Sequence, residues 1–247
     1  MKKIFVYNGS RRINGNTDKF VKHITDKLDK EVFEVEHAHP QDYNIAPCMG
    51  CGECFRKAGC VNRDDLEKLQ GKILESDVFI AASPVYMHYC TADMKLLIDK
   101  SAWWAHTFRL QGKPVVILST CETNGHDTVI KPFYKFFTCM GGNVIACSNA
   151  ARFPNQRNNE EWMENTSRDI ADRIKKYAFI PHSSNEDIEK IFVNTRALNC
   201  DLRDRVNITN IKPENGEYDY WCDTGMIDYE TFDEYLNEKY GCEEVLI

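Results

Sequence analysis

The chain has no long apolar run, although apolar residues make up 43% of its 247 residues. No stretch approaches the roughly 18 apolar residues of a membrane-spanning helix. The first ten residues, MKKIFVYNGS, include two lysines but too few apolar residues before Asn8 for the apolar stretch of a signal peptide. We therefore expect no membrane association and a cytoplasmic location.

Clustered positive charge is also missing. The formal net charge is -7. The sequence has no obvious stripe of lysine and arginine that could neutralise nucleic-acid phosphates. The negative charge is concentrated at one end, because residues 179–247 carry 6 Lys/Arg and 16 Asp/Glu and residues 1–178 have a net charge of +3. Nucleic acid is therefore not an expected partner.

Short β-prone runs alternate with amphipathic helical stretches through residues 1–178. The predicted strands are residues 3–7, 32–35, 77–82, 114–119 and 143–147, and the predicted helices are residues 16–30, 64–74, 94–104, 127–140 and 160–177. This alternation is typical of a doubly wound α/β fold with a five-stranded parallel sheet covered by helices on both faces. Ligands of such sheets bind outside the carboxyl ends of the strands.

Residues 179–247 break the alternation and form an acidic C-terminal extension to a domain of residues 1–178. Residues 187–198 and 228–240 have helical patterns, and residues 205–211 look strand-like. The extension holds too many aromatic residues for a disordered tail. We expect it to fold over the core as a lid or to embrace a partner subunit as an arm.

The loop after the first strand, from Gly9 to Thr17, has the composition of a phosphate site. Free amides at a helix N-terminus, the hydroxyls of Ser10 and Thr17, and a guanidinium from Arg12 or Arg11 suit a terminal phosphate monoester. The loop matches neither GxxxxGK[ST] nor GxGxxG. A plain polar turn with Asn16 as helix cap is the alternative.

Two further loops follow strand ends at the same edge of the predicted sheet. Ser83 to Met87 can offer backbone amides and an apolar wall to a flat ring, and Thr120 to Gly125 follows the next strand. Three loops would then surround one pocket.

The GSxRxxGNT loop and the SPVYxxxxxxxMKxxxD segment resemble the signatures of the flavodoxin-like NAD(P)H-dependent FMN reductase family, over about residues 1–178. The resemblance implies an oxidoreductase that moves electrons from NAD(P)H through FMN to a quinone, flavin or other small acceptor, and a homodimer or homotetramer. It implies no acid–base dyad, and we assign no catalytic residue. Many members have proline where Arg11 stands, which leaves the role of Arg11 open.

The same resemblance implies three groups of cofactor-binding residues. One group would hold the FMN phosphate, the second would border the isoalloxazine, and the third would close the pocket. These groups are, in that order, Ser10, Arg12, Asn16 and Thr17; Pro84, Val85, Tyr86 and Met87; and Thr120, Cys121, Glu122, Thr123 and Gly125.

Four of the eleven cysteines, Cys48, Cys51, Cys54 and Cys60, form C-x2-C-x2-C-x5-C in a glycine-containing loop. Two successive x2 spacings allow the chain to wrap around one corner of a compact inorganic core. Structural zinc more often binds to two CxxC knuckles separated by a longer segment. The spacing also resembles that of iron–sulfur flavoproteins, which implies a 4Fe-4S cluster on these four residues. A structural loop without metal is the alternative, and most of the other seven cysteines are expected to be buried.

Three functions remain open from the sequence. The first is the FMN-dependent enzyme described above. The second is an electron carrier that relays electrons between protein partners such as ferredoxins through the cluster and FMN. The third is a zinc-stabilised binding module without a redox task. His88, Trp103, Trp104, His106 and Phe108 could line a substrate pocket, although core or subunit contacts are the expected role of the tryptophans.

Overall fold

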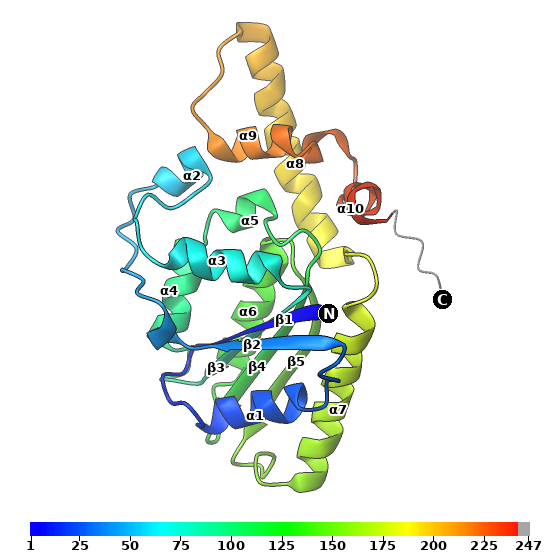
Figure 1. Ribbon diagram of the computed structural model, residues 1–247. Helices are drawn as coiled ribbons and strands as arrows, with labels where there is room; N and C mark the ends of the chain where they lie inside the picture. Colours follow the sequence, from blue (N-terminus) through cyan, green and yellow to red (C-terminus); the bar gives the residue numbers. More distant parts are fainter. Residues whose placement is uncertain (242–247) are drawn as a thin grey trace.

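The computed structural model describes residues 1–241, and a five-stranded, all-parallel sheet forms its centre (Figure 1). The strand order is β2-β1-β3-β4-β5. The strands are β1 (Lys2–Asn8), β2 (Phe33–Ala38), β3 (Val78–Pro84), β4 (Pro114–Cys121) and β5 (Asn143–Ala151). The predicted doubly wound, flavodoxin-like fold is confirmed.

Each strand presents alternate residues to two apolar layers, because successive side chains of a strand point to opposite faces. In β1, Ile4 and Val6 join the layer formed with α1 (Asn16–Thr25) and α7 (Glu160–Tyr177). Phe5 and Tyr7 join the other layer, which includes α3 (Leu66–Glu75), α4 (Ala92–Lys100) and α6 (Asp127–Cys139). Both faces of the sheet are therefore covered, as the apolar strand sequences predict.

Several element ends differ from the predicted ones. The first helix ends at Thr25 rather than near residue 30, and the helix predicted over residues 94–104 is interrupted after Lys100 and resumes as α5 (Trp104–Thr107). The long loop after β2 contains η1 (Pro40–Asp42) and a short helix, α2 (Glu53–Lys57). These are changes of boundary and leave the order of the sheet unaffected.

The C-terminal extension is helical in the described residues. It comprises α8 (Glu186–Thr209), α9 (Gly216–Asp223), η2 (Met226–Asp228) and α10 (Phe232–Tyr240). The strand predicted over residues 205–211 is wrong, because α8 continues to Thr209 and stops where Asn210 adopts a left-handed conformation. Two apolar residues of the predicted strand, Ile208 and Ile211, face solvent.

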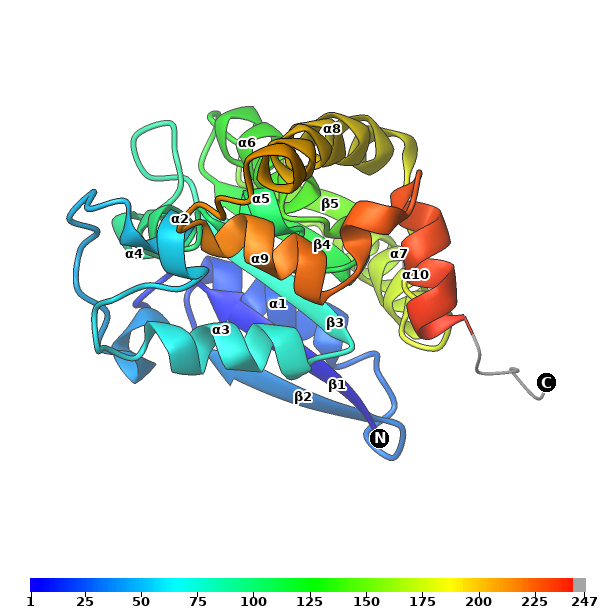
Figure 2. The same cartoon turned by 90° about the horizontal axis from the view of Figure 1, so that it is seen from above.

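A third apolar cluster joins the extension to the rest of the chain. Phe108, which follows α5, is fully buried against Phe192, Trp221 and Phe232, with ring centroids 5.2 to 5.8 Å apart. Figure 2 shows α8 and α9 lying over α5, with α2 beside α9. The extension therefore packs on its own chain through Phe108 and through the cysteine-containing loop.

Two further expectations concern membranes and cysteines. No helix within residues 1–241 has the length and apolar character required to cross a bilayer. The expected burial of the scattered cysteines is wrong for four of the six that the structure describes: Cys90 and Cys121 are buried, Cys139 and Cys200 are half-buried, and Cys147 and Cys222 are exposed. Cys242 lies outside the described residues.

Candidate functional site

The loops that follow β1, β3 and β4 meet at the carboxyl edge of the sheet around one open hollow of about 510 Å³. Most of the residues predicted to bind a cofactor line this hollow. They are Ser10, Arg12, Asn16, Thr17, Pro84, Val85, Tyr86, Thr120, Cys121 and Glu122. Sequence positions more than a hundred residues apart are thus brought together by the parallel sheet.

One end of the hollow is formed by the start of α1, where the sequence predicts a phosphate site. Gly15 is the N-cap residue of this helix and provides no side-chain cap, so the alternative interpretation of Asn16 as a capping residue is wrong. Asn16 and Thr17 instead form the first turn and face the hollow. An uncapped helix N-terminus leaves backbone amides available to an anion.

The loop before α1 is held from behind by a buried carboxylate and a buried imidazole. Asp18 accepts hydrogen bonds from the Asn14 amide at 2.8 Å and from Lys22 Nζ at 3.0 Å. Burial raises the pKa of Asp18, but these two hydrogen bonds together with the nearby positive charge of Lys22 outweigh it and leave the pKa below its ordinary value. His39 Nδ1 lies 2.9 Å from the Ser10 carbonyl oxygen. These contacts order the loop without occupying its open side.

The two arginines of the loop have different environments. Arg11 forms a two-pronged ion pair with Asp93 at the start of α4, with N–O distances of 2.9 and 2.7 Å. Arg12 lines the hollow. Arg11 therefore ties the loop to α4, and Arg12 is the guanidinium available to an anion in the hollow.

The opposite end of the hollow is formed by the turn after β3. The Val85 amide donates to the Thr120 carbonyl at 2.8 Å, and Tyr86 and Tyr89 pair through two backbone hydrogen bonds of 2.8 and 3.0 Å. Met87 lies at the tip of this turn with φ +48° and is 95% exposed, so it does not line the hollow. Thr123 does not line it either.

Gly125 acts in packing rather than in lining the hollow. Its φ is +82°, and a Cβ at this position would lie 2.8 Å from Val85 Cγ1 and 3.2 Å from His88 Nδ1. Only glycine allows this close approach in a left-handed conformation. Gly125 therefore lets the loop after β4 pack directly against the turn after β3.

Two residues that the sequence interpretation missed also line the hollow, Gly15 and Arg157. Arg157 follows β5, and both of its terminal nitrogens lie 3.0 Å from Glu122 Oε1. The hydrogen bond from Arg157 lowers the pKa of Glu122, so this exposed carboxylate stays ionised beside the hollow. Arg157 could have been found from the sequence, because it follows a strand at the same sheet edge.

The four-cysteine loop lies on the α3 side of the molecule. Cys48 and Cys51 are exposed, whereas Cys54 and Cys60 pack against the core. Burial raises the pKa of the Cys54 thiol, and the nearby Cys60, Cys48 and Cys51 raise it further. Within residues 1–241, no three cysteine, histidine or acidic side chains are arranged to hold a metal ion.

The C-terminal extension supports this loop through α2. Arg56 pairs with Glu214, the Phe55 ring stacks on His106 with centroids 5.4 Å apart, and His106 Nδ1 lies 2.9 Å from Glu217. A Cβ on Gly216 would lie 2.6 Å from the Arg56 carbonyl oxygen. The position of Cys54 on α2 therefore depends on the docking of α9.

Comparison with known proteins agrees with this arrangement. A family model described as NADPH-dependent FMN reductase matches residues 2–152. An iron-sulfur flavoprotein of Archaeoglobus fulgidus is 42% identical over 105 residues, which are 42% of this chain and 48% of that protein. This chain therefore matches about half the length of that relative. An iron-sulfur flavoprotein of Clostridioides difficile is 25% identical over 228 residues, 91% of this chain and 99% of that protein.

Among solved structures, RosB with the bound intermediate 8-demethyl-8-formylriboflavin-5'-phosphate has a TM-score of 0.59 and 17% identity, over 72% of this chain and 79% of that chain. At this identity the likeness supports the fold alone. The family model, by contrast, covers more than half of the chain and includes β1, β3, β4 and the loops that follow them. This chain belongs to the NADPH-dependent FMN reductase family, a family of oxidoreductases.

Proposed function

We propose that this chain binds FMN in the hollow at the carboxyl edge of the sheet and passes electrons from NAD(P)H to a small acceptor such as a quinone or a flavin. The observation that carries the proposal is the convergence of an uncapped helix N-terminus with the loops after β3 and β4 around one hollow. One end of this hollow suits a phosphate, and the other end suits a flat ring.

The donor set fits a phosphate ester. The α1 amides, the hydroxyls of Ser10 and Thr17 and the guanidinium of Arg12 are all hydrogen-bond donors that stabilise an oxyanion. Asp18 lies behind this loop and is already satisfied by Asn14 and Lys22. We infer that Ser10, Arg12, Asn16 and Thr17 hold the phosphate.

At the ring end, the chain's own residues would position and shield a flavin. The backbone of Pro84 to Tyr86 would border one edge of the ring, and Thr120 to Glu122 would close the other. Bound FMN would supply the hydride and electron chemistry, as cofactors of this kind do. The protein's task is then binding and orientation, and no side chain needs to act as a general acid or base.

Two measurements on the full chain test this function. Purified protein offered excess FMN should retain it after desalting, and NADH or NADPH added without oxygen should bleach the flavin absorbance. The matched variant Arg12→Met should lose most of the FMN, whereas Arg11→Met, which removes the guanidinium paired with Asp93, should retain more. Failure of the wild-type chain to retain FMN would overturn the proposal.

The cysteine loop supports a second candidate function, an electron carrier with a 4Fe-4S cluster on Cys48, Cys51, Cys54 and Cys60 and with ferredoxin-like protein partners. Several relatives are named iron-sulfur flavoproteins. Gly50 and Gly52 have φ of +65° and +75° with open space around them, which would allow the loop to wrap a compact core. The four thiols supply the donor set that such a cluster needs.

Iron and acid-labile sulfide, measured on protein prepared without oxygen, test the cluster. The carrier function requires that both iron and sulfide are present. Iron should be lost in Cys51→Ala and retained in Cys139→Ala, because Cys139 lies on α6. A flavin-containing protein without iron would support an FMN reductase that has no cluster. Zinc in place of iron would favour a structural metal site.

We further infer that residues 1–178 form the FMN-binding domain and that residues 179–247 act as its extension. A homodimer is also proposed, since large apolar side chains in the loops after β1, β3 and β5 are exposed. These are Ile13, Tyr86, Met87 and Phe153. Sedimentation of the wild type and of Met87→Asp tests this assembly, with dissociation expected for the variant.

A further inference from the structure

A second hollow lies beside the end of the cysteine loop, between α3 and α5, and shares no lining residue with the proposed FMN site. Its empty volume is about 830 Å³. Its walls combine apolar and aromatic residues with polar ones, among them one cationic and one anionic side chain. They include Cys60, Leu66, Leu74, Trp103, Trp104 and Arg109.

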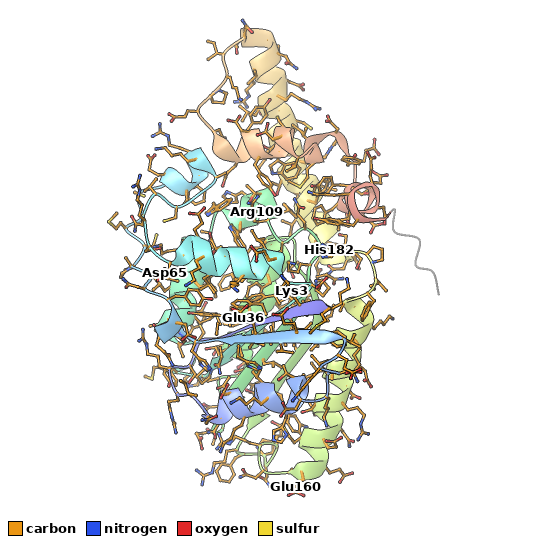
Figure 3. The ribbon with its side chains drawn as sticks, in the orientation of Figure 1. Lys3, Glu36, Asp65, Arg109, Glu160 and His182 are labelled. Atoms are coloured by element: carbon orange, nitrogen blue, oxygen red, sulfur yellow. The ribbon has the colours of Figure 1, made fainter. Side chains whose placement is uncertain are left out.

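Arg109 is the unusual member of this set. Figure 3 labels it beside α5, between α3 and α9. Its guanidinium carbon lies 5.7 Å from the centroid of the Trp103 ring and 4.9 Å from that of Tyr220 on α9. Its Nε–H has no acceptor within residues 1–241, and none of the ion pairs found there involves it. A half-buried guanidinium held between rings without an anionic partner is poised for an external anion.

The neighbouring donors point to the same deficit of acceptors. The indole N–H groups of Trp103 and Trp104 are buried without an acceptor in the described part of the chain. Three buried N–H donors on residues that line the hollow therefore lack an acceptor in the described part of the chain, and unpaired buried donors are costly. An anion in the hollow would compensate the charge of Arg109, whereas a cation would add to the positive charge.

Two charged residues line the hollow, Arg109 and Glu67. Glu67 lies at an exposed position, and no ion pair within residues 1–241 includes it. Arg109 is therefore the charged group at the half-buried wall, and its charge favours an anion.

We propose that this hollow is a second binding site, for a small organic anion that joins a carboxylate to a flat apolar body. Arg109 would bind the carboxylate with its two-pronged head group. The indoles of Trp103 and Trp104 lie nearly perpendicular, at 89°, and would contact the apolar body together with Leu66 and Leu74. The proposal does not depend on FMN binding, because the two hollows are separate.

Calorimetric titration of the full chain with benzoate tests the site, with benzamide as the neutral probe of the same shape. Saturable binding of benzoate is expected, with benzamide weaker by about tenfold, because a hydrogen bond to a charged group contributes about 1.5–3 kcal/mol. Arg109→Met should weaken benzoate binding by at least about tenfold, and Arg109→Lys should weaken it less. FMN content, measured in every sample, should remain unchanged.

Glu67→Gln provides a test that does not risk the fold, because Glu67 is exposed. Removing this carboxylate should tighten benzoate binding by about twofold to threefold and leave benzamide unaffected. Equal binding of benzoate and benzamide, unchanged benzoate binding in Arg109→Met that retains wild-type circular dichroism, or no saturable binding to the wild type would each overturn the proposal.

Discussion

The hydroxyl oxygens of Thr17 and Thr120 lie 2.6 Å apart and join the first turn of α1 to the end of β4 at the proposed FMN site. Either hydroxyl can be the donor. If Thr120 donates, the Thr17 proton is free for an anion in the hollow. This contact therefore couples the phosphate end of the hollow to its ring end.

Thr17→Val should weaken FMN binding by about tenfold, since a hydrogen bond to a charged group contributes about 1.5–3 kcal/mol. The measurement is the dissociation constant from flavin fluorescence quenching. Thr138→Val is the matched control, because Thr138 lies on α6 and its buried hydroxyl has no partner in the described residues. Equal FMN affinity of the two variants would contradict the proposed role of Thr17.

Lys100→Met should destabilise the protein by up to about 3 kcal/mol, because it leaves the largely covered Asp64 carboxylate without its cation. Lys100 is 1% exposed and pairs with Asp64, which also accepts hydrogen bonds from the Ala46 and Leu66 amides at 3.0 Å. Denaturant unfolding measures the loss.

The control for Lys100 is Lys72→Met, which removes an exposed pair with Glu36 at 2.8 Å. Exposed pairs contribute about 0–1 kcal/mol, so this variant should unfold almost as the wild type does. A similar loss in both variants would show that the burial of the Asp64 pair has no special effect.

Gly216→Ala should push α9 away from α2. A Cβ there would lie 2.6 Å from the Arg56 carbonyl oxygen and 2.7 Å from the Ala58 amide, and backbone atoms cannot yield as a flexible side chain does. We expect faster proteolysis in the cysteine loop. Gly71→Ala on α3 is the control, because open space surrounds its Cβ position and alanine favours a helix. Identical proteolysis of both variants would contradict the proposed support.

The ion pair between His106 and Glu217 should make extension docking depend on pH. The hydrogen bond from His106 to Glu217 raises the pKa of His106 above its ordinary value of about 6.5. Its contribution is therefore complete below that ordinary value and is lost as the pH rises through the raised one. Because His106 is more than half exposed, the contribution should stay below about 1 kcal/mol.

Unfolding of the wild type and of His106→Gln, compared at about pH 6 and about pH 8.5, measures this effect. The difference in stability should be larger at the lower pH. His23→Gln, at an exposed position on α1, is the control and should give a smaller pH-dependent difference. A larger difference at the higher pH would contradict the assignment.

The central fold could be predicted because its signals are local. Residues 77–82 and 114–119 are apolar on both faces, as only central parallel strands require. The extension was harder, because Val206 and Ile208 alternate like strand residues although Ile208 faces solvent on α8. The eight-residue α9 offers only Tyr218 and Trp221 as buried residues, too few for a periodic pattern.

The candidate site also has a part that could be predicted from the sequence and a part that could not. The loops after β1, β3 and β4 could be predicted because strand ends share one edge of a parallel sheet. Met87 could not be separated from its lining neighbours, since its outward direction arises from left-handed φ values at Met87 and His88. The spacing of the cysteines does not reveal that α2, which carries Cys54, packs against α9, more than 150 residues away.

Phe108 lies in the connection between α5 and β4, yet its ring completes the apolar cluster of the last helices. A protein shortened to residues 1–178 would retain Phe108, whose ring is fully buried in the whole chain. It would lose Phe192, Trp221 and Phe232, which cover this ring. The shortened protein would expose an apolar aromatic patch to water and would tend to self-associate. The last helices are therefore not a module independent of the rest of this chain, because the ring at position 108 belongs to their apolar cluster.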